Sequence, residues 1–410
     1  MRRVLLGITV MLLGLSILAS AHYYIAKRLI LDPGLPEPWR SAGLLLLVML
    51  ALSLVLQPIG ERKLRPPTSR WISWPASIWM GIAFLLLMQL LVSDAILALV
   101  GGVASAAGVA SGSESPTAAL RAAAVVAVSL VAGAIGLRNG LKPPMLKRVE
   151  IPLERWPAAL DGFRIVQITD IHIGPILDRR FAQHLVERVN ALDADLVAVT
   201  GDLVDGSERL LHDEVEPFSG LRGRYGVYFV TGNHDHYSGA SAWSERAREL
   251  GMRVLRNERV EIRVGPGDDF DRVGDFDRVG DFDQVGVFDL VGVDDHRGDV
   301  FGREGGEDLD AALSGREPGR PTVLLAHDPS TFKRASRMGI DLQISGHTHG
   351  GQIWPFHGFV RLVIPFIAGR YRRGSAELYV SRGTGFWGPP MRLGSAAEIT
   401  EITLRSRSKA

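Results

Sequence analysis

Five short motifs rich in metal-ligating side chains follow one another in the C-terminal two thirds of this 410-residue chain. The motifs are Asp170-Ile171-His172, Gly201-Asp202-Leu203-Val204-Asp205, Gly232-Asn233-His234-Asp235, the single residue His327 and Gly346-His347-Thr348-His349. Carboxylate, imidazole and amide ligands without thiolate suit Mn, Fe or Zn. Two such ions roughly 3.5–4 Å apart activate water and hold both oxygens of an in-line displacement at phosphorus. The residue types therefore predict two divalent metal ions and phosphoester chemistry.

Each motif begins where an apolar, β-branched run ends. The runs cover residues 163–169, 195–200, 226–231, 321–326 and 341–345. Near-continuous apolar runs are typical of strands buried on both faces. Residues 178–192 show helical spacing, with Phe181, Leu185 and Val189 on one face. Strand–helix alternation predicts an α/β fold, whose sites lie at the carboxyl ends of strands, and this would bring all five motifs together.

The motifs closely resemble those of the calcineurin-like metallophosphoesterases, in particular a bacterial membrane-associated branch. The resemblance covers about residues 150–405 and extends to Gly350-Gly351-Gln352 and Tyr379-Val380-Ser381-Arg382-Gly383. It implies a four-layer αββα sandwich, in which two β-sheets are flanked by helices. A single motif of this kind also occurs in ordinary turns, but five in order, each after a predicted strand, favour a site.

The resemblance also implies a role for each residue of the site. The first metal would be held by Asp170, His172, Asp202 and His349, and the second by Asp202, Asn233, His327 and His347. Asp202 would bridge the two ions. His234 would be the general acid, oriented by Asp235. We expect Asp205 to support its loop or the second ring nitrogen of a ligand histidine.

The residue after Asp205 narrows the expected substrate. The protein Ser/Thr phosphatase branch of the family usually has Arg at this position, where this chain has Gly206. A phosphoprotein substrate is therefore disfavoured, and phosphate mono- or diesters or pyrophosphates remain. Arg373, Arg382 and Arg392 are candidates for binding the substrate phosphate, because an Arg fork matches phosphate geometry.

The first 140 residues have the composition of a membrane domain. Four apolar segments are predicted to cross the bilayer, at Val4–Ala21, Ala42–Leu56, Ser77–Val100 and Ala122–Leu137. The third contains Asp94, near enough to its end for solvation at the interface. The first also resembles a cleavable signal peptide. We favour an uncleaved span, because three more follow.

The distribution of Lys and Arg predicts the orientation of these spans. Residues 62–70 and 138–148 are strongly basic, whereas residues 101–120 contain no Lys or Arg. The positive-inside rule therefore places the N-terminus and the catalytic domain in the cytoplasm. The cell membrane, crossed several times, is the predicted location.

The predicted organisation is a multi-span region at residues 1–140, a linker at 141–150, a phosphoesterase domain at 151–405 and a tail at 406–410. Within the domain, residues 266–293 contain a tandem hexapeptide repeat, beginning with Phe270-Asp271-Arg272-Val273-Gly274-Asp275. Its last copy resembles an ordinary strand of the family. The earlier copies resemble an expansion of that strand, more typical of a solvated, mobile segment than of a weak Ca²⁺ site.

Taken together, these features predict a membrane-anchored, two-metal phosphoesterase that uses metal-activated hydroxide. The anchor favours a lipid-linked phosphoester at the membrane surface. One alternative is a soluble phosphodiester or nucleotide hydrolase that is merely tethered, and another is a noncatalytic metal-binding scaffold or sensor. The formal net charge of +1 does not favour nucleic acid as a partner.

Overall fold

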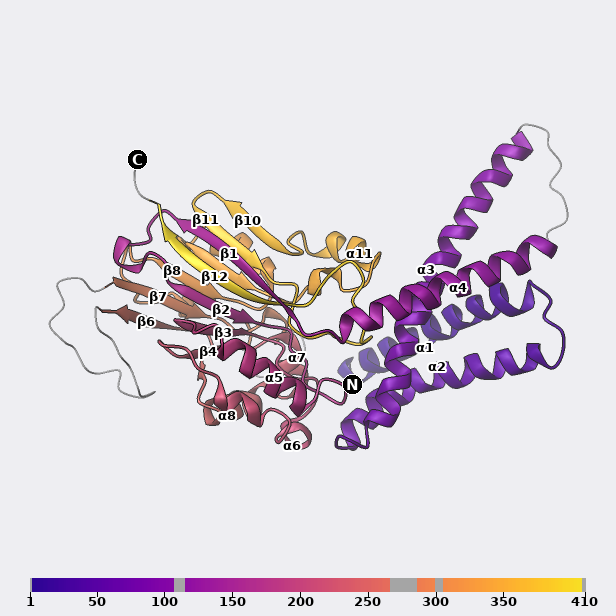
Figure 1. The fold of residues 1–410 in the computed structure, drawn as a ribbon, viewed down its shortest axis with the longest axis horizontal. Coiled ribbons are helices and arrows are strands. Elements are labelled where there is room, and N and C mark those ends of the chain that lie inside the picture. The colour runs from indigo at the N-terminus through magenta and orange to yellow at the C-terminus, as the bar shows by residue number, and fades with distance from the viewer. Residues whose placement is uncertain (1, 107–114, 266–285, 299–304, 408–410) are drawn as a thin grey trace. The chain divides into compact units, whose positions relative to one another are not determined.

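A computed structural model describes residues 2–106, 115–265, 286–298 and 305–407 of the chain (Figure 1). The chain forms two compact units. The first comprises Met1–Lys63, Thr68–Asn139 and Gly388–Met391, and the second comprises Leu64–Pro67, Gly140–Trp387 and Arg392–Ala410. The long helices belong to the first unit, and both β-sheets belong to the second.

The helical unit confirms the prediction of four long apolar helices. They are α1 (Arg2–Ala26), continued by a π-helical turn η1 (Lys27–Leu31), α2 (Trp39–Lys63), α3 (Arg70–Ala106) and α4 (Ser115–Gly140). Segments long and apolar enough to cross a membrane are Gly7–Leu31, Trp39–Lys63, Arg70–Gly101 and Thr117–Gly140. Each helix is longer than the apolar run in the sequence, because polar and small flanking residues continue it at both ends.

Asp94 of α3 is paired within the helical unit, which differs from the expected solvation. Its carboxylate oxygens lie 2.6 Å from a guanidinium nitrogen of Arg121 and 2.7 Å from one of Arg28. The Tyr24 hydroxyl also donates a hydrogen bond of 2.6 Å to it. Charge pairing between η1, α3 and α4 thus offsets the cost of placing this acid among apolar helices.

Two six-stranded sheets form the centre of the second unit. The first has the order β1 (Met145–Leu153), β12 (Glu398–Ser406), β2 (Arg164–Ile168), β3 (Leu196–Thr200), β4 (Val227–Val230), β5 (Arg253–Val254). The second has the order β10 (Gly369–Arg373), β11 (Ala376–Val380), β9 (Leu342–Ser345), β8 (Thr322–Leu325), β7 (Gly286–Gly292), β6 (Glu258–Val264). The central strands β2–β3–β4 and β7–β8–β9 are parallel. All five apolar runs therefore form strands, as predicted.

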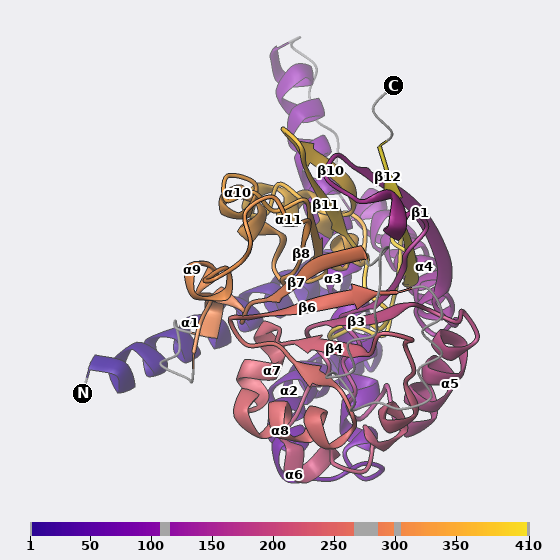
Figure 2. The ribbon, with the colours of Figure 1, turned by 90° about the vertical axis from the view of Figure 1, so that its left-hand side faces the viewer.

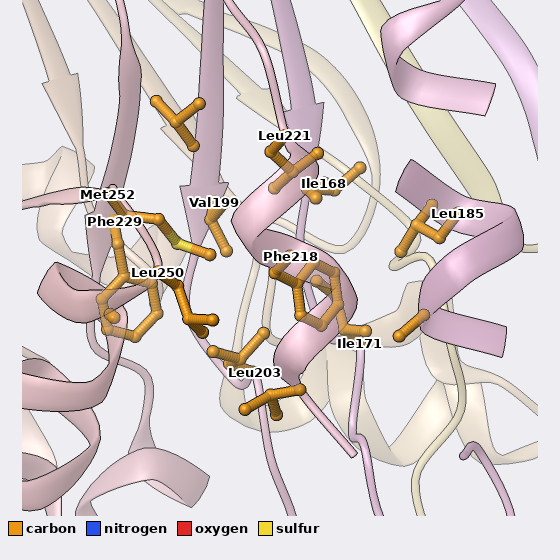
Figure 3. Packing of buried hydrophobic residues seen from close by; sticks show 14 of the residues in the cluster. Ile168, Ile171, Leu185, Val199, Leu203, Phe218, Leu221, Phe229, Leu250 and Met252 are labelled. Atoms are coloured by element: carbon orange, nitrogen blue, oxygen red, sulfur yellow. The ribbon is translucent and has the colours of Figure 1, made fainter. Parts of the chain in front are cut away.

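Side-chain alternation along β3 divides the hydrophobic core between two layers. Leu196 and Ala198 point into a core shared by both sheets, together with Phe288 and Leu342 of the second sheet. The alternate residue Val199 points to the outer face, where it packs with Phe218, Leu203 and other residues shown in Figure 3. The sheets therefore stack face to face, and each has an outer face to cover.

Helices cover both outer faces, so the predicted four-layer αββα sandwich is confirmed. On the first sheet lie α5 (Arg179–Asn190), α6 (Glu208–Leu211) and α8 (Ala240–Glu249), and on the second α9 (Leu309–Ala312) and α10 (Phe332–Ala335). Figure 2 shows α9 and α10 on the side of the sandwich away from α5 and α8. The helix predicted at 178–192 is α5, whose first turn is capped by the Asp178 carboxylate.

Two strands run across the predicted domain boundaries. Strand β1 begins at Met145, inside the predicted linker 141–150, because residues 145–153 pair in parallel with β12. Strand β12 ends at Ser406, one residue into the predicted tail. The last copy of the hexapeptide repeat lies in β7, and the copies before residue 286 lie outside the described residues.

Candidate metal centre

Each candidate ligand follows directly on a central strand. Asp170 follows β2, Asp202 follows β3, His327 follows β8 and His347 follows β9. Asn233 begins the short helix α7 (Asn233–Ser238) after β4, and His349 begins the 3-10 turn η6 (His349–Gly351). The parallel strands deliver these loops to one edge of the sandwich, which is where an α/β fold places its sites.

Asp170, His172 and His349 form one group of potential metal ligands. One ligand atom from each lies within 4.8 Å of the others. The Nε2 atoms of His172 and His349 are 3.0 Å apart, and Nε2 of His349 is 3.4 Å from Oδ1 of Asp170. All three side chains are buried. Two imidazole nitrogens and a carboxylate that converge in a buried space are the donors a borderline divalent ion prefers.

Asp202, His327 and His347 form a second group beside the first. Nε2 of His327 lies 3.1 Å from Oδ2 of Asp202 and 3.2 Å from Nδ1 of His347. Oδ2 of Asp202 is also 3.8 Å from Nε2 of His172, so this carboxylate lies between the two groups. The structure thus brings three candidate ligands together in each group, with Asp202 beside both.

The side chain of Asn233 provides a further indication of metal binding. Its side-chain oxygen is buried and, within the described part of the chain, has no hydrogen-bond partner. An unsatisfied buried polar atom costs roughly 1–3 kcal/mol. Coordination to a metal would remove that cost. The residues therefore fit divalent metal binding.

The backbone of the ligand loops is strained in a way that aims the side chains. Among the non-glycine residues the structure describes, positive φ angles include those of five candidate ligands. They are Asp170, His172, Asp202, His347 and His349, with φ between 50° and 73°. Left-handed backbone is uncommon outside glycine, and such outliers cluster at functional sites.

Two of the candidate ligand histidines are held in orientation by contacts of the ring nitrogen Nδ1. Nδ1 of His327 lies 2.8 Å from the carbonyl oxygen of Thr200, and Nδ1 of His172 lies 2.9 Å from Oδ1 of Asp205. These contacts favour a proton on Nδ1, which leaves Nε2 as the ring nitrogen that can coordinate an ion once it is deprotonated. The expected support of a ligand histidine by Asp205 is thus present.

The electrostatics of the metal-free centre favour the metal-binding form of some ligands and oppose that of others. Asp202 outweighs the effect of burial and holds the pKa of His327 well above its usual value, and burial raises the pKa of Asp170, so both must lose a proton when an ion binds. Burial alone would raise the pKa of Asp202, but the charges of His327 and His234 outweigh it and hold that pKa well below its usual value. Burial, together with His172 and Arg392, holds the pKa of His349 well below its usual value. An ionised Asp202 and a neutral His349 are the forms that coordinate a cation.

His234 lies beside these groups and contacts Asp205. Its Nδ1 is 2.7 Å from Oδ1 of Asp205, and its ring packs edge-on against the rings of His172 and Trp387. Burial would lower its pKa, but Asp205 and Asp202 outweigh this and raise the pKa to about 9. In the metal-free centre these carboxylates therefore favour the protonated imidazole, whose Nδ1 faces Asp205.

The structure corrects the prediction that Asp235 orients His234. The Asp235 carboxylate accepts hydrogen bonds from the backbone N–H groups of Gly232, Asp202 and Leu203, at 2.8–2.9 Å. It ties the loop after β3 to the loop after β4. The neighbouring position in α7 turns the carboxylate away from the His234 ring, and the contact is made by Asp205 instead.

The three candidate phosphate-binding arginines lie in different surroundings. Arg392 is fully buried, and its guanidinium donates to the carbonyl oxygens of His349, Arg382 and Gly385. It therefore holds the loops around His349 in place. Arg382 packs beside Gly350, pairs with Glu398 and keeps a side-chain exposure of 40%. Arg373 is exposed at the end of β10.

Trp387 is a residue of the site that the sequence reasoning missed. Its ring centroid lies 5.5 Å from that of His234. Gln352 holds its backbone, donating from Nε2 to the Trp387 carbonyl oxygen and accepting from the Trp387 N–H. No spacing in the sequence links residue 387 to residue 234, and only the fold brings them together.

An αββα sandwich with Asp, His and Asn ligands at the strand ends defines a metal-dependent hydrolase fold of the phosphoesterase class. Residues 163–351 match the calcineurin-like phosphoesterase family. The chain belongs to this family of metallophosphoesterases. The resemblance inferred from the motifs is confirmed.

Similar proteins share both the domain and, in one case, a described membrane region. A bovine "Transmembrane protein with metallophosphoesterase domain" is 39% identical over 70% of this chain and 63% of its own length. The chain thus spans less than two thirds of that relative. An uncharacterized metallophosphoesterase of Helicobacter pylori strain J99 is 32% identical over 67% of this chain and 68% of its own length. An uncharacterized metallophosphoesterase of Aquifex aeolicus is 30% identical over 64% of this chain and 92% of its own length.

Proposed function

We propose that the protein is a two-metal phosphoester hydrolase that acts on phosphate mono- or diesters or pyrophosphates. The observation that carries this proposal is the position of Asp202. Its carboxylate lies between two groups of buried ligands, within 3.1 Å of His327 Nε2 and 3.8 Å of His172 Nε2. A carboxylate in that position suits two ions that share a ligand.

The proposed ligand sets follow the two groups. Asp170, His172, Asp202 and His349 hold one ion, and Asp202, Asn233, His327 and His347 hold the other. Mn, Fe and Zn suit this mixture of oxygen and nitrogen donors. When bound, the ions supply Lewis acidity and an activated water.

The remaining step needs a proton donor, and His234 has the required geometry. Asp205 holds Nδ1 of the imidazole, so Nε2–H is the bond that faces away from the carboxylate. The raised pKa of about 9 keeps that proton in place at neutral pH. We propose that His234 donates it to the leaving oxygen of the ester. Arg382 is the exposed guanidinium next to η6 and is the proposed phosphate contact among the three arginines.

We propose that the protein is a multi-pass protein of the cell membrane, with the catalytic domain on the cytoplasmic side. The four apolar helices and the basic residues next to α2 and α4 support this. Helix α4 ends at Gly140 and β1 begins at Met145. A domain joined so closely to the apolar helices supports a lipid-linked phosphoester over nucleic acid as the substrate.

The test is hydrolysis of an aryl phosphodiester by the purified full-length protein with added Mn²⁺, together with metal analysis. The expected result is turnover and two ions per chain. Asp202→Asn should abolish turnover and lower the metal content to one ion or none, because the shared ligand loses its charge. A folded wild-type protein that binds no metal and shows no turnover would support the alternative of a noncatalytic scaffold or sensor.

A further inference from the structure

A group of large apolar side chains lies exposed beside the candidate metal centre. Helix α11 (Phe356–Val363) has no buried residue. Leu362 is 85% exposed, Val363 75%, Trp354 61% and Trp387 52%. We call this surface the apolar rim, and it consists of Trp354, Phe356, Phe359, Leu362, Val363 and Trp387. Scattered apolar residues are normal on a protein surface, but a contiguous group rich in aromatic residues marks an interaction surface.

The apolar rim is joined directly to the site. Gly351 ends η6, and a Cβ added there would lie 2.4 Å from the Cα of His357, so α11 packs tightly against the loop that carries His349. At the other side of the rim, Gln352 holds the backbone of Trp387, whose ring packs edge-on near His234. Whatever covers the rim is therefore held close to the proposed proton donor.

The charge of this segment matches an anionic lipid surface. Residues 342–376 contain no Asp or Glu, and Arg361 is exposed on α11 between Phe359 and Leu362. Short amphipathic helices with Trp, Phe and Leu on one face and Arg or Lys beside them lie at the boundary between headgroups and acyl chains. Tryptophan itself prefers that boundary.

Backbone hydrogen bonds place the rim a few residues of chain from the start of β1, the strand that follows α4. The Met145 N–H at the start of β1 donates to the Ala397 carbonyl oxygen, and the Trp354 N–H donates to that of Leu393. Leu393 and Ala397 are four residues apart, which is at most about 14 Å of chain. From Gly140 to Met145 the chain spans at most about 18 Å. The rim is thus joined by short stretches of chain to the end of the last apolar helix, α4.

We propose that the apolar rim inserts into the bilayer in which the chain is anchored and presents the metal centre to phosphoester headgroups of membrane lipids. This inference rests on the proposed hydrolase function for the identity of the reaction. The insertion itself rests only on the rim and its tether. The covering partner is the lipid surface, and coverage by the protein's own helices or by a second copy is an alternative outcome of the test.

The first experiment measures insertion without using activity. The chain contains 0 Cys, so Leu362→Cys creates a single labelling site for an environment-sensitive fluorophore. The matched control is Ala159→Cys, which is exposed in η2 (Ala158–Leu160), beyond the far end of β1 and about 30 Å of strand away from the linker. Both proteins are placed in nanodiscs of phosphatidylglycerol and phosphatidylethanolamine, with or without acyl-chain nitroxide lipids.

The expected result is strong quenching by the nitroxide lipids at Leu362 and none at Ala159. Equal quenching at the two positions would overturn the proposal. A blue-shifted emission at Leu362 that the nitroxide lipids do not quench would also overturn it, because protein rather than lipid would then cover the rim.

The second experiment separates failure of the inference from failure of the proposed function. Hexadecyl p-nitrophenyl phosphate in the nanodisc and methyl p-nitrophenyl phosphate in solution share the bond to be cleaved. Leu362→Glu should lower the rate of hydrolysis of the hexadecyl ester at least about tenfold, because the free energy of burying one Leu side chain corresponds to about that factor. The rate of hydrolysis of the methyl ester should not change. Ala159→Glu should change neither. Equal effects of Leu362→Glu on both esters would overturn the inference, whereas hydrolysis of neither ester by the wild type would refute the function and leave the quenching result to decide insertion.

Discussion

At the scale of single residues, substitutions in the pair His234–Asp205 test the proposed proton donation separately from metal binding. His234 belongs to neither proposed ligand set, although it lies close enough to His172 and Asp205 to form a third group of potential ligands. We expect His234→Ala to keep both metals and to lower turnover by roughly 10²–10⁴-fold on an alkyl phosphoester. The loss should be much smaller on a p-nitrophenyl ester, whose leaving group needs little protonation. Metal content and turnover on the two esters are the measurements.

Asp205→Asn is the companion variant for this prediction. It removes a charge that raises the pKa of His234, so that pKa falls and the proton is lost at lower pH. The alkaline limb of the pH–rate profile should therefore move to lower pH. If His234→Ala instead loses its metals, His234 is a ligand and the assignment of its role is wrong.

Residue types carried most of the information about the centre, but they did not reveal side-chain direction. The ligand groups follow from Asp, His and Asn at the ends of apolar runs, and the structure brings them together as expected. The hydrogen-bond partner of His234 could not be inferred in this way. Asp235 is adjacent to His234 in the sequence, but its carboxylate accepts hydrogen bonds from backbone N–H groups instead. Asp205, on another loop, reaches the ring only after β3 and β4 have paired.

At the scale of elements, the loops after β3 and β4 approach so closely that glycine is required between them. A Cβ at Gly232 would lie 2.2 Å from Oδ1 and 2.5 Å from the backbone nitrogen of Asp202. Gly232→Ala must therefore displace Asp202, at a cost of about 1–3 kcal/mol. We expect it to lower metal content and turnover while the fold is retained, measured by metal analysis and circular dichroism.

The matched control for Gly232→Ala is Gly220→Ala. A Cβ at Gly220 meets only Cγ1 of Val186, at an ordinary contact distance of 3.5 Å. This variant should keep its metals and its turnover. Normal metal content in Gly232→Ala would show that the two loops move apart without effect, and the close packing would then have no role in the site.

The hexapeptide repeat offers a second prediction at this scale. Deleting residues 270–281 removes two copies but leaves β6 and β7 and the residues that join them. A shorter connection costs less entropy to close, so we expect the deletion variant to keep its stability and turnover, as measured by thermal unfolding and aryl phosphodiester hydrolysis. A variant that folds but has no activity would show that the repeat takes part in function.

Strands were predictable from the sequence, whereas their pairing was not. Runs such as residues 195–200 are apolar throughout, as expected of strands covered on both faces. The partner of the N-terminal strand β1 is β12, from the opposite end of the domain. Nothing local in residues 145–153 specifies that long-range pairing, and the predicted boundary at residue 151 falls inside β1.

At the scale of the whole molecule, the two units follow from different physical patterns. The helical unit shows long uncharged runs, and the sandwich shows short runs punctuated by Gly, Asp and His. Both patterns are visible without a structure, and the family match of residues 163–351 agrees with the second. The paired Asp94 was not predictable, because its partners Arg28 and Arg121 lie on segments that meet it only in the folded helical unit.

The orientation of the molecule in the membrane is a prediction from charge. Basic residues gather between α2 and α3 and after α4, whereas residues 101–120 contain none. Each basic residue opposes translocation, so both basic segments should stay in the cytoplasm. A fluorescent protein that folds only in the cytoplasm should be bright when fused to the C-terminus, and alkaline phosphatase, active only outside, should be inactive there. Alkaline phosphatase inserted within residues 107–114 should be active. This insertion is the positive control, because it shows that the reporter is expressed and can fold in this protein. A stable C-terminal alkaline phosphatase fusion with full activity would place the metal centre outside the cell, where cytoplasmic phosphoesters could not be its substrates.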